Sequence, residues 1–382
     1  MRKPFLLLCL SAMALAAACS KEKDVEPPAE LVDFKARVAI DRAWSLGTGG
    51  GEEHMRLALA PAVEGEIAYL AGHDGDVFAV NAKTGRNVWK TDLKLHLSAG
   101  PGVGGGLVVV GSADGDLVAL DAASGAELWR TTLGGELLAR PVVGGSMVVA
   151  HTVDGTVRGL NARDGVQAWL YEQPVPRLSL RGTAPPVIDG DAAICAFDNG
   201  KVASLGLSDG DLLWSATVGT PRGRTELQRL VDIDSAVQVS GDDIFVVGYQ
   251  GRAAMLARSS GQIWWARDMS SYRGLALDGS ALYVSSAEGA VVAMSRRDGT
   301  EVWRQNALRL RGLTAPVVDG EAIVVGDFDG YMHWLDRETG EMIGRVKAGG
   351  DRISNAPVAA NDMVYVQSDG GTVYAFRSRP RG

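Results

Sequence analysis

The side chains that most often carry catalysis or hold metals are few in this sequence, and their spacing suits neither task. The chain has 382 residues with five histidines and three cysteines, and it contains no Cys-x-x-Cys or His-Glu-x-x-His motif. Aspartates recur before glycine, as in Asp114-Gly115 and Asp154-Gly155, and this pairing is typical of tight turns. The sequence therefore predicts no catalytic residue, no metal site and no bound cofactor.

Residue types suited to binding another protein gather in two stretches. Residues 173–182 and 220–234 mix leucines with arginines and carboxylates. Arginine and apolar anchors carry much of the free energy of binding at protein interfaces. We therefore expect a partner-binding surface at these stretches. In the alternative interpretation, Leu178 and Leu180 pack inward and Asp232 pairs with Arg229.

The scaffold that positions these stretches is a repeat of about forty residues. Its most regular unit is Ala119–Trp129, with the sequence ALDAASGAELW. Each unit follows a glycine, and successive glycines are 38 to 51 residues apart, which is typical of a repeat architecture. The copies that end in tryptophan are Ala79–Trp89, Gly159–Trp169, Ser204–Trp214, Met255–Trp265 and Ala293–Trp303. A further copy, Trp334–Gly344, has Gly344 in place of the tryptophan.

Each repeat reads as four short antiparallel strands, A to D, joined by glycine turns. The second strand is a run of apolar residues, such as Leu107–Val110, and such a run indicates burial on both faces. A single four-stranded sheet cannot cover both of its own faces, so neighbouring repeats must do so. The sequence therefore predicts an all-β propeller of four-stranded antiparallel blades over residues 39–382.

The two ends of the chain are complementary. The last repeat stops at Gly382 before its D strand, whereas Arg42–Ser45 resembles a D strand with no A, B or C strand before it. We predict that this N-terminal strand pairs beside Val373–Phe376 and closes the ring at eight blades, which removes two open sheet edges. Trp44 would then be the eighth tryptophan.

The two leucine- and arginine-containing stretches are where the repeat is longest. Both follow the D-strand tryptophan, and they lengthen their repeats by about 5 and 11 residues. Connections from D to A and from B to C emerge on one face of a blade, so both stretches should form one raised patch. On a surface patch, Arg181→Glu or Asp232→Arg is expected to leave the thermal melt within a few degrees.

The N-terminus has the features of an exported lipoprotein. Residues 1–18 predict a signal peptide, with Arg2-Lys3 before an apolar stretch. The sequence LAAACS ending at Ser20 resembles the lipobox of bacterial lipoproteins, which makes Cys19 the lipid attachment residue; cleavage at an ordinary Ala-x-Ala site is the alternative. Residues 19–38 are polar and predict a lipidated flexible tether. Serine after the cysteine resembles lipoproteins sorted to the outer membrane, so we expect anchorage there, facing the periplasm.

Charge and cysteine content limit the possible partners. The net charge is −8 and becomes −10 once Arg2 and Lys3 leave with the signal peptide. An acidic chain without a basic stripe is not expected to bind nucleic acid. Cys195 alone remains in the body of the mature chain, so no intramolecular disulfide is expected and burial as a small apolar residue is the default.

The repeat A-x-D-x-x-[TS]-G-x-x-x-W resembles the tryptophan-docking repeat of pyrroloquinoline quinone (PQQ)-dependent dehydrogenases. Together with the lipobox, Leu178–Gly182 and Arg229–Asp234, it makes the chain from Cys19 to Phe376 similar to the BamB family of outer-membrane propeller lipoproteins. The resemblance implies a non-enzymatic scaffold of the β-barrel assembly (BAM) machinery. It would bind the POTRA domains of BamA, reach other BAM subunits through BamA, and assist the delivery and insertion of unfolded outer-membrane proteins.

The same resemblance implies which residues bind the partner. In that family, leucines and an arginine of the first loop and aspartates of the second dock on the POTRA domains. The matching residues here are Leu178, Leu180, Arg181, Asp232 and Asp234. A PQQ-dependent dehydrogenase is one alternative, although such an enzyme would be expected to carry an adjacent cysteine pair, which this chain lacks. A propeller that binds a periplasmic ligand in its channel is the other.

Overall fold

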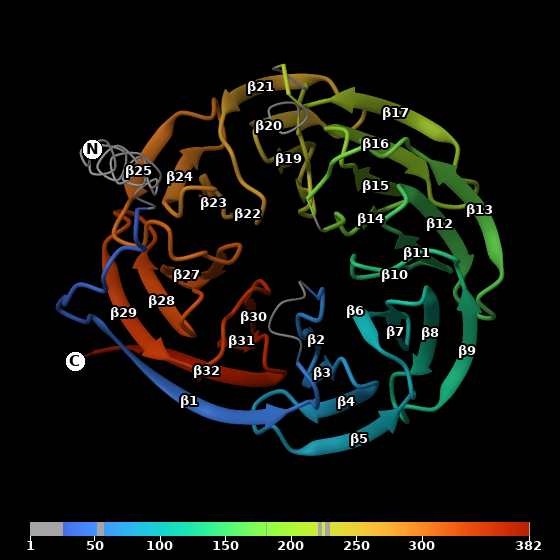
Figure 1. The fold of residues 1–382 in the computed structure, drawn as a ribbon, viewed down its shortest axis with the longest axis horizontal. Helices are drawn as coiled ribbons and strands as arrows, with labels where there is room; N and C mark the ends of the chain where they lie inside the picture. Colours follow the sequence, from blue (N-terminus) through green and yellow to red (C-terminus); the bar gives the residue numbers. More distant parts are fainter. Residues whose placement is uncertain (1–25, 52–56, 181, 221–223, 226–229, 382) are drawn as a thin grey trace, which may run out of the picture.

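Eight four-stranded antiparallel sheets stand around a central axis in the computed structural model (Figure 1). The structure describes residues 26–51, 57–180, 182–220, 224–225 and 230–381. The expected all-β, eight-bladed propeller is therefore confirmed. Within those residues, no helix is long and apolar enough to cross a membrane.

In every blade the A strand lies nearest the axis and the D strand lies at the rim (Figure 1). Blade 1 is β2 (Ala62–Glu64), β3 (Ile67–Ala71), β4 (Asp76–Asn81) and β5 (Asn87–Asp92). Blade 2 is β6 (Leu97–Gly104), β7 (Leu107–Ser112), β8 (Asp116–Asp121) and β9 (Glu127–Thr132). Blade 3 is β10 (Val142–Gly144), β11 (Met147–His151), β12 (Thr156–Asn161) and β13 (Gln167–Glu172). Blade 4 is β14 (Val187–Asp189), β15 (Ala192–Ala196), β16 (Lys201–Gly206) and β17 (Leu212–Thr217).

The second half of the ring repeats this order. Blade 5 is β18 (Gln238–Ser240), β19 (Asp243–Val247), β20 (Arg252–Ala257) and β21 (Ile263–Asp268). Blade 6 is β22 (Leu275–Leu277), β23 (Ala281–Ser285), β24 (Val291–Ser295) and β25 (Glu301–Gln305). Blade 7 is β26 (Val317–Asp319), β27 (Ala322–Gly326), β28 (Tyr331–Asp336) and β29 (Met342–Lys347). Blade 8 is β30 (Val358–Ala360), β31 (Met363–Gln367), β32 (Thr372–Pro380) and β1 (Val38–Gly47).

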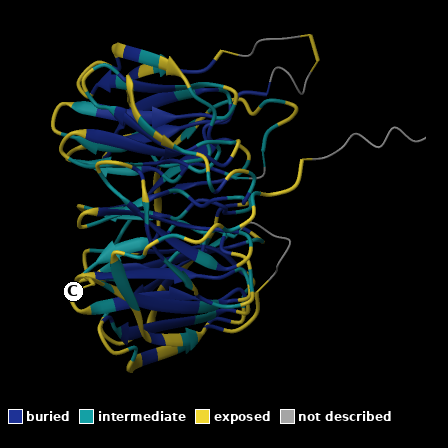
Figure 2. Ribbon diagram, turned by 90° about the vertical axis from the view of Figure 1, so that its left-hand side faces the viewer, coloured by how far each residue is buried: buried dark blue, intermediate teal, exposed yellow. Residues whose placement is uncertain are grey.

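The apolar B and C strands form the interior of the ring, and the exposed turns lie at its two faces (Figure 2). Val108, Val109 and Val110 of β7 have no exposed side-chain surface. The hydrophobic core is a set of layers between blades, since one cluster joins Tyr69 and Val77 of blade 1 to Val108 and Val118 of blade 2. Each blade therefore buries its faces only in contact with its neighbours, as the unbroken apolar runs predict.

At seven of the eight junctions a tryptophan at the rim couples one blade to the next. The Trp89 indole nitrogen donates a hydrogen bond to the Ala122 carbonyl oxygen of the following blade at 2.9 Å. Its ring lies on Gly125 in the C–D turn of that blade, where a Cβ atom would come within 2.5 Å of the ring. Trp129 contacts Gly165 in the same way. The glycine of one repeat and the tryptophan of the previous repeat are thus two halves of one contact.

The ends of the chain close the ring. Strand β1 pairs antiparallel with β32, with Trp44 opposite Ala375 and Leu46 opposite Val373. The Trp44 indole nitrogen donates to the Ala82 carbonyl oxygen of blade 1 at 2.8 Å, which repeats the contact made by the other rim tryptophans. The predicted closure by an N-terminal strand, with Trp44 as the eighth tryptophan, is confirmed.

Closure also explains the tryptophan missing at Gly344. A tryptophan there would dock on the C–D turn of blade 8, but strands C and D of that blade come from opposite ends of the chain and share no turn. Val38 and Ile40 of β1 occupy the space instead. A Cβ atom on Gly344 would lie 2.5 Å from Val38 and 2.8 Å from Ile40.

The segment before β1 is packed against the propeller. The Ala29 N–H donates to the Arg309 carbonyl oxygen at 2.9 Å, and the Arg311 guanidinium donates to the Ala29 carbonyl oxygen at 3.1 Å. Further along, Arg345 of β29 donates to the Val32 carbonyl oxygen at 3.1 Å. The expectation of a flexible tether over residues 19–38 is therefore wrong from residue 26 onward, because arginines of blade 7 and of the connection before it hold this backbone. Cys19 and the signal peptide lie outside the described residues.

The tryptophan–glycine contact gives a stability prediction with a matched control. Gly125 and Gly105 both have positive φ, but a Cβ atom on Gly105 would meet nothing within 4 Å. Alanine at either position carries the strain of a left-handed residue, whereas Gly125→Ala must also displace Trp89. We expect Gly125→Ala to cost about 1–3 kcal/mol more than Gly105→Ala in denaturant unfolding. Equal losses in the two variants would contradict the docking role.

Candidate partner-binding site

The two long connections meet at one face of blades 4 and 5. The first joins β13 to β14, and the second joins β17 to β18. The Tyr249 N–H, in the turn between β19 and β20, donates to the Asp232 carbonyl oxygen at 2.7 Å. A D-to-A connection therefore lies against a B-to-C turn, which confirms that both kinds of connection emerge on the same face.

Asp232 ties the two connections together. Its carboxylate accepts a hydrogen bond from the Leu180 backbone N–H at 2.7 Å. The Asp232 side chain is 0 % exposed, so it lies beneath the surface and holds the first connection from below. The expectation that Asp232→Arg acts as a mild surface change is therefore wrong, because arginine would have to enter a buried site.

The first connection supplies the apolar surface. Leu178 is 42 % exposed and Leu180 is half-buried, whereas Leu230, Val231 and Ile233 of the second connection are all buried. The alternative in which the leucines pack inward is therefore wrong for Leu178. Inward packing is instead found for the apolar residues of the second connection. We call the exposed part of the first connection, Val175 to Leu180, the docking patch. Arg181 and Arg229 lie outside the described residues.

A cluster of three carboxylates lies under the docking patch. Asp198, in the turn after β15, joins Asp232 and Asp234, and one oxygen from each lies within 4.8 Å of the others. Burial and the nearby Asp234 charge raise the pKa of Asp198 to about 7, against a hydrogen bond from Ser179 that lowers it. Burial, followed by the charges of Asp234 and Asp198, also raises the pKa of Asp232. The cluster therefore favours protonated carboxyl groups.

Among the described residues, this cluster is the one group of acidic side chains placed closely enough to share a cation. It offers three carboxylate ligands, whereas calcium takes six to eight oxygens. The raised pKa of Asp198 also means that protons compete for the same oxygens. The arrangement is suited to positioning the Leu180 backbone rather than to holding a cation.

The buried histidines and the cysteine have structural surroundings. His73 Nδ1 lies 2.8 Å from the Leu97 carbonyl oxygen, and His151 Nδ1 lies 3.0 Å from the Ala184 carbonyl oxygen. Burial lowers the pKa of His151 to about 4, so the ring stays neutral at pH 7. Cys195 is fully buried, as expected, and burial raises the pKa of its thiol to about 12.

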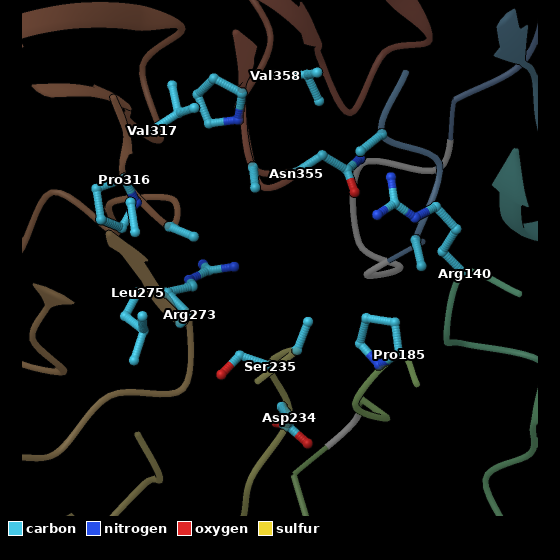
Figure 3. A pocket seen from close by; sticks show the side chains of 18 of the residues that line it. Arg140, Pro185, Asp234, Ser235, Arg273, Leu275, Pro316, Val317, Asn355 and Val358 are labelled. Carbon is cyan, nitrogen blue, oxygen red and sulfur yellow. The ribbon is translucent and has the colours of Figure 1, made fainter. Parts of the chain in front are cut away.

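The sequence groups Asp234 with Asp232 as a partner-binding residue, but Asp234 lies toward the central axis of the propeller. It lines the central cavity together with Thr183 and Ser235, and Figure 3 shows it at the cavity wall. Asp234 therefore belongs to the cavity wall, whereas no residue of the docking patch lines the cavity. Sequence reasoning missed Asp198, although its place in a B-to-C turn puts it on the same face as both insertions.

The chain is similar to proteins of known name over almost its whole length. It is 47 % identical to the outer membrane protein assembly factor BamB of Pseudomonas aeruginosa over 96 % of this chain and 97 % of that protein. The crystal structure of BamB from Moraxella catarrhalis matches with a TM-score of 0.81 at 29 % identity, covering 89 % of this chain and all of that one. A europium-containing methanol dehydrogenase, at 15 % identity and a TM-score of 0.73 over 88 % of this chain and 93 % of its own, shares the fold alone.

Fold and repeat define a class: a propeller of tryptophan-docked repeats with two long connections on one face. A family model described as outer membrane protein assembly factor BamB matches residues 38–93, 73–305 and 287–379. The chain belongs to the BamB family.

The Asp232 bond predicts opposite effects of two substitutions. Asp232→Ala leaves the Leu180 N–H without its acceptor, which is expected to cost about 1–3 kcal/mol. Asp232→Asn keeps an acceptor oxygen and cannot ionise beside Asp198 and Asp234, so the melting temperature should stay the same or rise. Scanning calorimetry of the two variants measures this difference. An Asp232→Ala protein as stable as the wild type would contradict the proposed tie.

The Asp198 carboxyl group predicts a pH dependence of stability. Because its folded-state pKa of about 7 lies above the ordinary value of 3.8, its contribution is fully present below about pH 4. That contribution is lost as the pH rises toward and through 7. Wild-type protein should therefore lose several degrees of melting temperature between pH 5 and 8, and Asp198→Asn should lose less. The exposed Asp211→Asn is the control; an identical slope in all three proteins would refute the assignment.

Proposed function

We propose that this protein is a non-enzymatic scaffold of outer-membrane protein assembly that binds the POTRA domains of BamA through the docking patch. Relatives that share nearly the full length are named as assembly factors, which supports the assembly role. The main support for choosing this surface as the binding site is the Asp232–Leu180 hydrogen bond. It fixes the backbone next to Leu178, whose side chain is exposed to solvent.

A fixed loop favours binding. An ordered docking patch loses little conformational freedom when a partner binds, so more of the contact energy appears as affinity. The patch is fixed from two sides, by Asp232 under Leu180 and by Asn199, whose amide donates to the Pro174 carbonyl oxygen at 3.4 Å. In this proposal Leu178, Leu180 and Arg181 touch the partner. Asp232 is a positioning residue, and Asp234 borders the contact at the mouth of the cavity.

The proposal includes a lipid on Cys19 that anchors the protein to the periplasmic face of the outer membrane. Glu26 is the first described residue, and its carboxylate pairs with Arg309. Six residues lie between Cys19 and Glu26, and the seven Cα-to-Cα steps span at most roughly 25 Å when extended. Since the backbone is held on the propeller from residue 26, the anchor would keep blades 6 and 7 close to the bilayer. The docking patch, in the connection from blade 3 to blade 4, would lie farther around the ring.

Contact with other BAM subunits would pass through BamA, and unfolded outer-membrane proteins are the further partners of the proposal. The rim strands support this second role. Leu213 of β17 is 58 % exposed and Trp264 of β21 is 54 % exposed, so two neighbouring D strands present apolar side chains beside free strand edges. An extended chain can add to such an edge as a further strand.

The docking patch gives a binding prediction with a matched control. Leu178→Asp and Arg181→Glu should each reduce capture of the purified BamA periplasmic domains at least tenfold, because each introduces an uncompensated charge at the contact. Leu128→Asp changes a leucine of similar exposure, 51 %, on the D strand of blade 2 and should not affect capture.

Melting temperatures of the three variants should stay within a few degrees of wild type. Undiminished capture by both patch variants would refute the surface assignment. Loss of capture in the Leu128→Asp protein as well would show that the effect is not specific to the patch.

A further inference from the structure

The axis of the propeller holds a cavity that the assembly role does not use. Its volume is about 560 Å³, which lies within the range of small-molecule sites. The inner ends of several blades supply its wall, including Pro185, Leu275, Pro316, Val317 and Val358 (Figure 3). A second chamber of about 790 Å³ follows along the axis and shares Arg140 with the first.

Arg140 is the unusual side chain of this wall. It lies just before β10, and Figure 3 shows its guanidinium group inside the cavity. Burial lowers the pKa of Arg140, and no hydrogen bond or ion pair joins its guanidinium to any described residue. Arg258, in the second chamber, is by contrast paired with Asp189. Arg140 is half-buried, and a cation partly withdrawn from water without a counter-charge among the described residues is costly for the folded protein.

The facing wall adds a second cation. Arg273 reaches into the cavity from the opposite side (Figure 3). Its guanidinium lies over the Tyr272 ring at 5.0 Å from the centroid and donates to the Ser354 carbonyl oxygen at 3.3 Å, which fixes its position. Among the described residues that line the cavity, Asp234 is the one acidic side chain, so their formal charges sum to a positive value in a chain of net charge −8.

Polar hydrogen-bonding groups complete the site. The Asn355 side-chain amide lies on the same side of the cavity as Arg140, and the Ser235 hydroxyl lies below it (Figure 3). The rest of the wall consists largely of proline, valine, leucine and alanine side chains. A guanidinium group recognises a carboxylate with two parallel hydrogen bonds, and apolar walls favour a ligand with a hydrocarbon body.

We propose that the axial cavity binds a small organic carboxylate, with the carboxylate on the Arg140 guanidinium and the apolar part of the molecule against Pro316, Val317 and Val358. The positive cavity within an acidic protein concentrates anions at its mouth. Arg273 and Asn355 orient the bound group. The proposal stands independently of BamA binding, since Arg140 lies on the axis and not in the docking patch.

Calorimetric titration with two probes of the same shape tests the charge. Sodium benzoate should bind the full-length mature protein, and benzyl alcohol, its neutral counterpart, should bind at least tenfold more weakly. Arg140→Gln should weaken benzoate binding at least tenfold, whereas Arg86→Gln, a change at an exposed arginine on the rim, should leave it unchanged. Absence of benzoate binding by the wild type, or equal binding by Arg140→Gln, would overturn the proposal.

The thermal melt separates a binding role from a structural one. Because Arg140 has no partner among the described side chains, Arg140→Gln should melt at the wild-type temperature or above it. Benzoate should raise the melting temperature of wild type but not of the variant, since ligands stabilise only the state that binds them. A large fall in melting temperature without ligand would assign Arg140 a structural role and overturn the proposal.

A last comparison identifies the source of the carboxylate. The tripeptide Ala-Ala-Val with a free C-terminus carries the same chemical group at the end of a chain, and its C-terminal amide lacks the charge. Binding of the acid tenfold tighter than benzoate would support a chain end as the natural ligand. Tighter binding of benzoate would support a free small acid. Equal binding of the peptide acid and its amide, together with no benzoate binding, would exclude carboxylate recognition.

Discussion

The contact between a tryptophan and the glycine turn of the next blade is the constraint on which the ring depends. No blade can bury both of its faces alone, so the fold is stable only when every blade is seated against two neighbours. The Trp129 indole reaches the Ala162 carbonyl oxygen at 2.8 Å while its ring covers Gly165, which fixes distance and orientation together. The same geometry recurs at Trp44, which belongs to the last blade although it stands near the start of the sequence.

A ring built in this way leaves little freedom to its regular parts, and the proposed binding surface lies where the repeat is interrupted. The long connections after blades 3 and 4 are adjacent in the ring, so they support one another through Asp232 and Leu180. Buried carboxylates hold this region, and burial raises the pKa of both Asp198 and Asp232. The arrangement uses polar groups that are costly to bury in order to give a loop one conformation, which supports the proposal that this region binds a partner.

Much of the fold could be predicted from particular residues. The glycine spacing defines eight repeats, the apolar run Leu107–Val110 indicates a strand buried on both faces, and Trp44 supplies the element missing from the last repeat. The sequence also indicates where the candidate site lies, because the periodicity is broken at both insertions. The orientation of single side chains could not be predicted. The sequence marks Asp232 and Leu178 alike as candidate partner-binding residues, yet Asp232 is fully buried and Leu178 is 42 % exposed.

Local pattern and period were enough to specify the number of blades, the direction of the strands and the face that carries the long loops, since each follows from interactions between residues close in the chain or one repeat apart. Contacts between residues far apart in sequence had to be seen in the folded chain. Asp198 in the turn between β15 and β16 meets Asp232 in the connection from β17 to β18, residues 26–37 rest on arginines nearly three hundred positions later, and Arg140 faces Arg273 across the axis. These juxtapositions depend on how the closed ring brings separate loops together, and no repeat encodes that by itself.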